Sequence, residues 1–393
     1  MINKMPARSW SASGRKIAIA FKPYATIKEP FSGGMGNFVY LLSKYLAERG
    51  HQVTVLAGKD SILAPKVKLY SPKHSENSYN VYQAGDQFYQ YVNSKLKTKQ
   101  EVVNQSFSEL SKRFDRKIEA YLEFFSYVSM NDFDVVHVVT HDIIATYSAL
   151  FSNTPAVVSF HGHYDILGPD FISWLKFIKK SKSPKHCIFV SVSKYIQKEY
   201  DNFLKSKLIY NAIDVSRYTL QTKKQNYIAF LGRIDYYKGL EFAIKFSQKY
   251  KIPLKIGGRV EDKPYFNKLK KEIDGKLIKF LGPQNETQKN KLLGNAKALM
   301  MSSHYAEAFG RVTAEALACG TPVIAFNKGA SPELITNGKT GFIIPENNLT
   351  AAKKAWDKIG KIKPQTCRDF VAKNFDIKTQ ILQYEMLYKK LKK

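Results

Sequence analysis

Cysteine is scarce in this chain, and no apolar run is long. Only Cys187, Cys319 and Cys367 occur in 393 residues. Their odd number and wide spacing argue against a disulfide framework or a zinc site and indicate a reducing compartment. No uninterrupted apolar stretch is long enough to cross a bilayer. The basic, polar start lacks the apolar core of a secretory signal, so we expect a flexible leader over 1–15 and a cytoplasmic protein.

Acidic residues are also few. Against 62 Lys and Arg stand 33 Asp and Glu, which gives a formal net charge of +29. Such a field attracts polyanions, so nucleic acid and the anionic face of a membrane are both candidate partners. A chain that uses lysine as its default surface residue would carry the same charge without such a partner. Because the basic residues are dispersed and no nucleic-acid-binding motif is present, no specific nucleic acid is expected.

The length and the hydrophobic pattern predict two α/β domains. A chain of 393 residues is long for one core, and 44% hydrophobic residues exclude wholesale disorder. Short apolar runs alternate with helical patterns, which is typical of doubly wound parallel sheets. We expect domains over 16–208 and 209–370 and a final segment over 371–393 that is helical. Residues 100–128 interrupt the alternation and show the spacing of an amphipathic helix.

The segment Glu307–Phe326, EAFGRVTAEALACGTPVIAF, carries two carboxylates eight positions apart. The pattern predicts that Glu307 lies in a loop and that Glu315 lies in the second turn of a helix that Gly320 ends. Both are then within reach of one ligand across the helix N-terminus, where free N–H groups and the helix dipole favour a diphosphate. This arrangement suits a sugar nucleotide, although two solvated glutamates on an amphipathic helix would give the same pattern.

This segment resembles the signature of retaining glycosyltransferases of the GT-B fold, family 4, also called group 1. The family pattern is Glu-x-Phe-Gly-x-x-x-x-Glu-Ala-x-Ala-x-Gly-x-Pro-Val. It is matched by Glu307, Phe309, Gly310, Glu315, Ala316, Ala318, Gly320, Pro322 and Val323. Further motifs agree in order from Lys16 to Ile344, with Gly329-Ala330 where many members have two glycines.

The resemblance implies two Rossmann-like domains with a cleft between them. The C-terminal domain would hold the nucleotide sugar, the N-terminal domain would contribute the acceptor site, and the last helix would pack back toward the N-terminal domain. Within the signature, Glu307 would bond the donor sugar and Glu315 the ribose, with Phe309 and Gly310 also in the donor site.

Two more motifs supply donor-binding candidates. Gly34 belongs to a glycine-rich turn before a helix, where the backbone can approach a phosphate closely, although such a turn alone is weak evidence. Arg233 and Lys238 follow an apolar strand and match the family's Gly-Arg…Lys-Gly element. Cations at a strand's carboxyl end would neutralise a diphosphate and stabilise it as a leaving group.

His161 resembles the family's active-site histidine at the end of strand AVVSF, so we expect it to be catalytic together with Glu307. His163 and Asp165 would substitute for it in a shifted alignment, and His137 and His141 are lesser candidates. No carboxylate pair accompanies these histidines at metal-ligand spacing, and no Asp-x-Asp element follows a strand. We therefore expect neither a metal nor another cofactor.

The segment Phe171–His186 interleaves Trp174, Phe177 and Ile178 with lysines. It predicts either a helix that inserts its apolar face into an anionic membrane or a helix that covers the first sheet.

The expected activity is transfer of a hexose to an acceptor hydroxyl on a lipid-linked or envelope glycan. Residues 258–273 and 330–333 resemble the branch that includes UDP-glucose-dependent enzymes, which favours UDP-glucose as donor. A sugar-nucleotide epimerase of the same fold, a glycogen-type phosphorylase and a basic nucleic-acid-binding protein are the alternatives. The phosphorylase would need a pyridoxal-binding motif that is absent.

Overall fold

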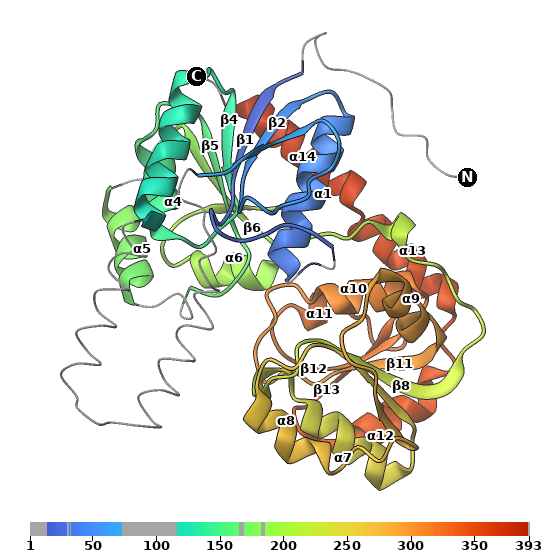
Figure 1. Ribbon diagram of the computed structural model, residues 1–393. Helices are drawn as coiled ribbons and strands as arrows, with labels where there is room; N and C mark the ends of the chain where they lie inside the picture. The colour runs from blue at the N-terminus through green and yellow to red at the C-terminus, as the bar shows by residue number, and fades with distance from the viewer. Residues whose placement is uncertain are drawn as a thin grey trace, which may run out of the picture. The chain divides into compact units, whose positions relative to one another are not determined.

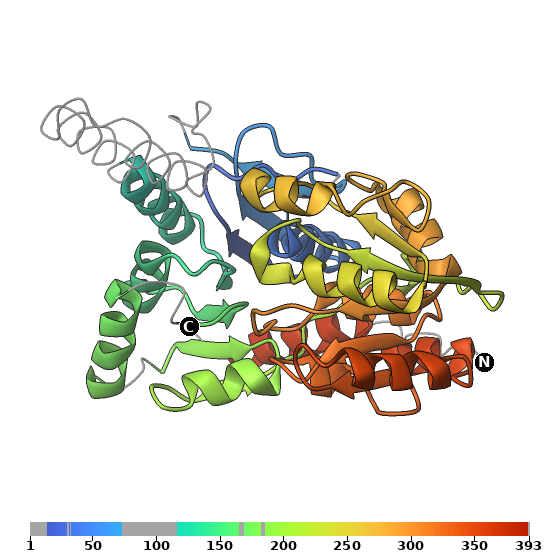
Figure 2. The same cartoon turned by 90° about the horizontal axis from the view of Figure 1, so that it is seen from below.

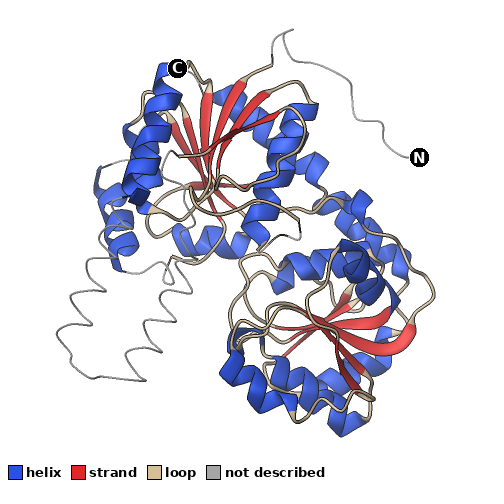
Figure 3. Ribbon diagram, in the orientation of Figure 1, coloured by secondary structure: helices blue, strands red, loops and turns tan. Residues whose placement is uncertain are grey.

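The computed structural model describes residues 14–29, 31, 33–72, 116–164, 169–181 and 185–391. The fold is α/β: it contains two β-sheets, of seven and six strands, with helices on both faces of each (Figures 1 and 3). The chain divides into two compact units: unit 1 comprises 1–160, 167–189 and 385–393, and unit 2 comprises 161–166 and 190–384. The predicted class of two Rossmann-like sheets is confirmed.

Two of the predicted segments lie largely or partly outside the described residues. Of the leader predicted over 1–15, only residues 14 and 15 are described. Of the amphipathic helix predicted over 100–128, the structure describes residues from 116 onward, and 116–130 are helical.

In the seven-stranded sheet the strand order reverses between the neighbouring strands β1 and β4. Its strands in spatial order are β3 (Val67–Tyr70), β2 (Gln52–Leu56), β1 (Lys16–Ala20), β4 (Val135–Val138), β5 (Ala156–Phe160), β6 (Cys187–Ser191) and β7 (Ser206–Leu208). Its helices are α1 (Gly34–Glu48), α4 (Ile143–Phe151), α5 (Pro169–Ser181), α6 (Lys194–Tyr200) and α14 (Ile377–Lys390). The strands β4 and β5 are buried along their whole length, as their runs of valine predict.

Polar side chains attach the end of α14 to unit 1. The buried ring of His137 on β4 bonds the Tyr388 hydroxyl through Nδ1 at 2.7 Å and the Ser159 hydroxyl through Nε2 at 2.8 Å. Glu385, also buried, accepts hydrogen bonds from Arg49 Nη2 at 2.9 Å and from His51 Nε2 at 3.1 Å. Because these groups satisfy one another, the burial of each costs less than it would alone.

The apolar face of α5 packs inward. Phe171, Trp174, Leu175 and Ile178 are all buried in unit 1. The alternative in which this face inserts into a membrane is therefore wrong, because Trp174 and Ile178 already lie in the core. Of the aromatic residues of the segment, Phe177 alone stays exposed, beside the exposed Lys176.

The six-stranded sheet of unit 2 is parallel at every pairing. Its strands in spatial order are β10 (Ile278–Phe280), β9 (Leu254–Gly257), β8 (Gln225–Leu231), β11 (Ala296–Met301), β12 (Val323–Phe326) and β13 (Gly341–Ile344). Its helices are α7 (Leu240–Tyr250), α8 (Lys263–Lys270), α9 (Glu286–Asn295), α10 (Arg311–Ala318), α11 (Ser331–Leu334), α12 (Leu349–Ile359) and α13 (Pro364–Asn374), with short 3-10 turns η2 (Val215–Arg217) and η3 (Tyr236–Lys238).

Helices cover both faces of this sheet. Figure 1 shows α9, α10 and α11 over one face and α7, α8 and α12 over the other. The view from below in Figure 2 shows the yellow and gold helices α7 and α8 side by side. Gln248 on α7 donates to Glu272, just beyond α8, at 2.7 Å. The strand order reverses between β8 and β11, so the loops after these two strands emerge next to each other.

We predict that unit 1 loses stability in mild acid because of His137. Burial lowers the pKa of this ring to about 3, against about 6.5 in the unfolded chain. The neutral ring therefore stabilises the fold fully above pH 6.5, and that contribution is lost as the pH falls from 6.5 toward 3. At pH 5 the loss should be about 2 kcal/mol.

Urea unfolding at pH 7.5 and pH 5, followed by tryptophan fluorescence in a Trp356→Phe background, measures the loss in unit 1. His137→Gln should be less stable at pH 7.5 but should lose less between the two pH values. An equal loss in both proteins would show that other groups cause the acid sensitivity.

Candidate functional site

Two loops of unit 2 emerge side by side where the strand order reverses. Arg233 and Lys238 follow β8, and Glu307 follows β11, its neighbour in the sheet. Ligands of open α/β sheets bind beyond the carboxyl ends of the strands at such a point. Three of the predicted site residues are therefore on neighbouring strand ends.

The two loops touch through their backbones at Gly239. This residue has a φ of 66°, and a Cβ atom here would lie 1.9 Å from the Ser302 carbonyl oxygen. Ser302 Oγ donates to the Gly239 carbonyl at 2.7 Å, and the His304 N–H donates to the Tyr237 carbonyl at 2.9 Å. Only glycine permits this approach, so Gly239 sets the distance between the Lys238 turn and the Glu307 loop.

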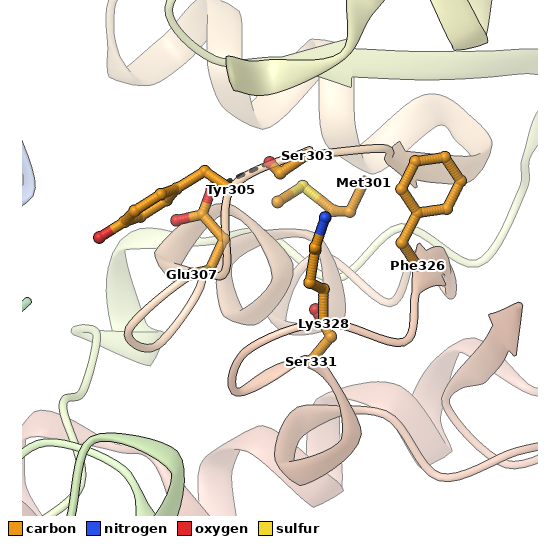
Figure 4. Close-up of a pocket in the computed structure, with 7 residues that line it drawn as sticks. All are labelled: Met301, Ser303, Tyr305, Glu307, Phe326, Lys328 and Ser331. Atoms are coloured by element: carbon orange, nitrogen blue, oxygen red, sulfur yellow. Dashed lines mark hydrogen bonds between the residues drawn. The ribbon is translucent and has the colours of Figure 1, made fainter. Parts of the chain in front are cut away.

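An ion pair joins the same two loops. Lys238 Nζ donates to Glu307 Oε1. The same oxygen accepts a hydrogen bond from Ser303 Oγ at 3.0 Å, drawn as a dashed line in Figure 4. Burial raises the pKa of Glu307, but the charge of Lys238 and the hydrogen bonds from Lys238 and Ser303 outweigh it, so the pKa lies below its usual value. Glu307 is thus an ionised acceptor, and its side chain stays 18% exposed.

A small pocket opens beside Glu307. Figure 4 shows the residues that line it: Met301, Ser303, Tyr305, Glu307, Phe326, Lys328 and Ser331. They come from the end of β11 and the loop after it, from the end of β12, and from the turn into α11. The pocket therefore combines hydroxyls, a carboxylate and an ammonium group, which is a surface suited to a polar ligand such as a sugar.

The turn at Gly329 supports the backbone of Glu307. Its φ is 57°, and a Cβ atom here would lie 2.4 Å from the Glu307 carbonyl oxygen. The next residue, Ala330, has a φ of −80° and donates its N–H to the Glu307 carbonyl at 2.9 Å. This explains why alanine replaces the second glycine of the family pattern: only the first position needs a left-handed conformation and a missing side chain.

Side chains also hold the carbonyl groups on either side of Glu307. His163 Nε2 donates to the Ala306 carbonyl at 2.8 Å, and Ser193 Oγ donates to the Ala308 carbonyl at 2.6 Å. The Tyr195 hydroxyl lies 3.3 Å from His163 Nδ1. Three successive carbonyl groups of the Glu307 loop are thus bonded, which restricts the carboxylate's position.

Glu315 lies in the second turn of α10, as predicted, and is buried. Lys289 Nζ is 4.0 Å from its Oε2 atom. Burial lowers the pKa of Lys289, but the charges of Glu315 and Glu286 outweigh it and raise the pKa. The Tyr218 side chain also hydrogen-bonds Glu315. Glu315 is therefore held by Lys289 and Tyr218.

The remaining donor candidates differ in what their side chains do. Arg233 is 57% exposed, with Nη2 3.3 Å from Asp235 Oδ2. Phe309 is buried against Phe375, so its ring packs in the core and only its backbone is left for a ligand. Gly310, with a φ of 86°, caps the N-terminus of α10.

Gly34 and His161 belong to other segments than the loop that carries Glu307. Gly34 is the first residue of α1 in unit 1. No described atom lies within 4 Å of a Cβ atom built on Gly33 or Gly36, so packing among the described residues does not require these glycines. His161 is half-buried just after β5, and His163, the residue of the shifted alignment, donates to the Ala306 carbonyl in the Glu307 loop. Asp165 lies outside the described residues.

Sequence reasoning missed Ser193, Ser303 and the capping role of Glu333. Glu333 accepts the N–H groups of Lys194 and Tyr195, both at 2.8 Å, at the N-terminus of α6. Ser193 and Ser303 each follow a buried strand closely, which is the signal that could have found them. In the part of the chain that the structure describes, no group of three His, Cys, Asp or Glu side chains is placed to hold a metal ion.

Comparison with known families identifies both halves of the chain. A model of glycosyltransferase family 4 matches residues 32–217, and a model of glycosyl transferases group 1 matches residues 214–374. A Klebsiella pneumoniae protein described as an uncharacterized 41.2 kDa protein in the cps region is 24% identical, over 72% of this chain and 86% of that protein. Glycogen synthase of Mycobacterium tuberculosis is 30% identical over 34% of each chain.

Solved structures share the fold over nearly the whole length. Sucrose-phosphate synthase from Thermosynechococcus elongatus has a TM-score of 0.73 at 17% identity, covering 96% of this chain and 99% of that chain. Anabaena HepE, solved in complex with UDP-glucose, has a TM-score of 0.66 at 15% identity, covering 96% and 100%. The protein belongs to glycosyltransferase family 4, the glycosyl transferases group 1; it has the GT-B fold and transfers a sugar from a nucleotide sugar.

Proposed function

We propose that the protein moves a hexose from UDP-glucose to an acceptor hydroxyl on a lipid-linked or envelope glycan, with retention of the anomeric configuration. The observation that carries the proposal is the Lys238–Glu307 pair at the point where the strand order of unit 2 reverses. The pair supports the proposal because an ammonium group suits a diphosphate and a neighbouring carboxylate suits sugar hydroxyls, and a nucleotide sugar carries both.

Each donor residue has a proposed part of the donor to bind. Glu307 accepts hydrogen bonds from sugar hydroxyls, and Glu315 accepts them from the ribose. Arg233 and Lys238 carry the diphosphate, assisted by the backbone at Phe309 and Gly310. Gly34 of unit 1 supplies a backbone approach to the donor phosphate, which is supported by the open space over the neighbouring glycines of its turn.

The proposed chemistry relies on leaving-group stabilisation. The bond between the anomeric carbon and the diphosphate oxygen breaks while the acceptor oxygen bonds the same face of the sugar, and the acceptor hydroxyl passes its proton to the departing diphosphate. Arg233 and Lys238 stabilise the charge that develops on the diphosphate, so a divalent cation is not needed for that task. His161 is the proposed catalytic histidine, and no side chain is assigned as a covalent nucleophile.

The relatives support the donor and the acceptor class only by similarity. HepE was solved with UDP-glucose, and the Klebsiella relative is named for a cps region. A sugar-nucleotide epimerase would bind a similar donor but would release no nucleotide and would need no acceptor. Release of UDP that depends on an added acceptor therefore separates the two activities.

We predict that Glu307 and Glu315 separate catalysis from nucleotide binding. Glu307→Gln should abolish transfer while UDP still binds, because the carboxylate serves the sugar. Glu315→Gln should weaken UDP binding about tenfold or more, because a charge-assisted hydrogen bond to the ribose is lost. Calorimetry with UDP and single-turnover assays with UDP-glucose measure the two effects. Unaltered turnover of Glu307→Gln at saturating donor would reject its assigned role.

We predict that Lys238 and Arg233 recognise charge on the donor. Replacing either with alanine should weaken UDP binding roughly ten- to a hundredfold and uridine binding much less. Lys245→Ala, an exposed lysine of α7, is the matched control and should change neither. The titrations should give the same affinities in EDTA. Equal losses for UDP and uridine would point to a folding defect, and a requirement for Mg²⁺ would contradict the metal-free proposal.

A basic, aromatic surface of unit 1 supports a membrane partner. Phe151 at the end of α4 is 73% exposed and Phe177 on α5 is 44% exposed. The Tyr147 ring lies between them, with centroids 6.1 Å from Phe151 and 6.2 Å from Phe177. Lys176, Lys179 and Lys180 are exposed on the same helix as Phe177. No helix in the described ranges has both the length and the hydropathy for a membrane crossing, so we propose peripheral binding to the anionic cytoplasmic leaflet.

We predict that Lys176, Lys179 and Lys180 contribute to vesicle binding together, at about 1 kcal/mol or less each. Replacing all three with Gln should weaken sedimentation with anionic vesicles at low salt. Replacing Lys245, Lys249 and Lys268, which are exposed in unit 2, removes the same charge and should have a smaller effect. Equal losses in the two triple variants would indicate a general charge effect. Tighter binding to RNA than to vesicles at matched salt would favour the nucleic-acid alternative.

A further inference from the structure

His304 lies in the loop after β11, three residues before Glu307, and carboxylates contact both of its ring nitrogens. Nε2 bonds Glu241 in the first turn of α7, and Nδ1 lies 2.9 Å from Glu346 Oε1, just after β13. The ring stacks on Tyr236 of η3, with centroids 5.1 Å apart, and is 15% exposed. Three different elements therefore enclose this side chain.

The contacts require a protonated ring. A carboxylate only accepts hydrogen bonds, and a neutral imidazole has a single N–H, so one carboxylate would face a nitrogen lone pair. The imidazolium donates to both. Burial lowers the pKa of His304, but the hydrogen bonds and charges of Glu241 and Glu346 outweigh it and raise the pKa above its usual value.

The charged groups around His304 alternate in sign. Lys328 Nζ donates to Glu346 Oε2 at 2.8 Å, and the Tyr265 hydroxyl donates to Glu241. The net charge of this row is therefore zero while the ring is protonated; in order, the row consists of Lys328, Glu346, His304 and Glu241. When the ring loses its proton, Lys328 alone is left to balance the charges of two carboxylates. The contact of the His304 loop with either Glu241 on α7 or Glu346 is then weakened.

The same row reaches the donor pocket. Lys328 lines the pocket beside Glu307, and Figure 4 shows both side chains there. The His304 backbone N–H bonds the Tyr237 carbonyl, next to Lys238. Movement of His304 would therefore disturb the loop that carries Glu307 and the turn that carries Lys238.

We propose that His304 is a positioning residue that, as an imidazolium held by Glu241 and Glu346, fixes the loop 302–307 in the geometry that binds the donor. The part that concerns the donor rests on the proposed function. A group whose pKa is raised in the folded protein stabilises the structure below its unfolded value, and this stabilisation is lost as the pH rises through the folded value. Donor binding should therefore weaken on the alkaline side.

The first experiment measures the ring itself. NMR titration of histidine-labelled protein, with the His304 signal assigned by its loss in His304→Gln, should give a pKa above 6.5. Glu346→Gln and Glu241→Gln should each lower that pKa, whereas Glu272→Gln, a half-buried carboxylate beside α7 that bonds Gln248, should not. A ring pKa below 6.5, or one that neither variant lowers, overturns the proposal.

The second experiment measures the consequence for binding. UDP-glucose is the probe, because its diphosphate diester does not titrate between pH 6 and 9. Its affinity should fall with rising pH, by about tenfold if binding raises the ring pKa by one unit. His304→Arg, which keeps a positive charge with several N–H donors, should bind without this pH dependence. His304→Gln should bind weakly throughout. Parallel pH profiles for wild type and both variants overturn the proposal.

Hydrogen exchange of residues 302–309, corrected for the intrinsic effect of pH, keeps this test separate from the donor assignment. Protection should fall above the ring pKa in the wild type and stay constant in His304→Arg. If UDP-glucose does not bind at any pH, the proposed donor is wrong while exchange still decides the role of His304. Exchange that is equally pH-dependent in both proteins rejects that role.

Discussion

The site of unit 2 depends on one close contact, between the turn after β8 and the loop after β11. Neighbouring parallel strands end at the same edge of a sheet, so the loops that follow them occupy adjoining space and must pack against each other. Here hydrogen bonds to the carbonyl groups of Gly239 and Tyr237 join the two loops and bring Lys238 and Glu307 together. A single added Cβ atom at Gly239 would separate them. The backbone contact between the two loops therefore determines that a cation and a carboxylate lie close together, and the side chains then complete the pair.

Electrostatics then decides what each carboxylate in this region can do. Asp235 and Glu307 both lie near Lys238, yet their pKa values shift in opposite directions. Burial raises the pKa of Asp235 and outweighs the charges of Arg233 and Lys238, while Lys238 and Ser303 lower that of Glu307 despite its burial. Asp235 accepts the Lys238 backbone N–H and caps η3. Asp235 therefore shapes the turn, whereas Glu307 stays ionised beside Lys238.

Much of this arrangement could be predicted from the sequence because it is local. The alternation of apolar runs and helical patterns predicts both sheets, and Gly310 and Gly320 bound α10 as expected. The eight-residue spacing correctly places Glu307 in a loop and Glu315 in the second helical turn. The apolar face of α5 was ambiguous for a physical reason: an amphipathic helix looks the same whether it covers a sheet or a membrane.

What the sequence could not predict is which distant residues support the loop. His161 and His163 occupy similar surroundings in the chain, and only the folded structure shows that the ring of His163 bonds the Ala306 carbonyl. His304 looks like an incidental loop residue, since Glu241 and Glu346 are 63 and 42 positions away. Such partners are set by the order of strands in the sheet rather than by spacing along the chain. In a chain with few acidic residues, the carboxylates at this sheet edge nevertheless each contact a cation or a polar donor. Positive charge alone would attract a diphosphate to any part of the surface. The paired carboxylates distinguish this edge chemically, because they add fixed hydrogen-bond acceptors beside the cations.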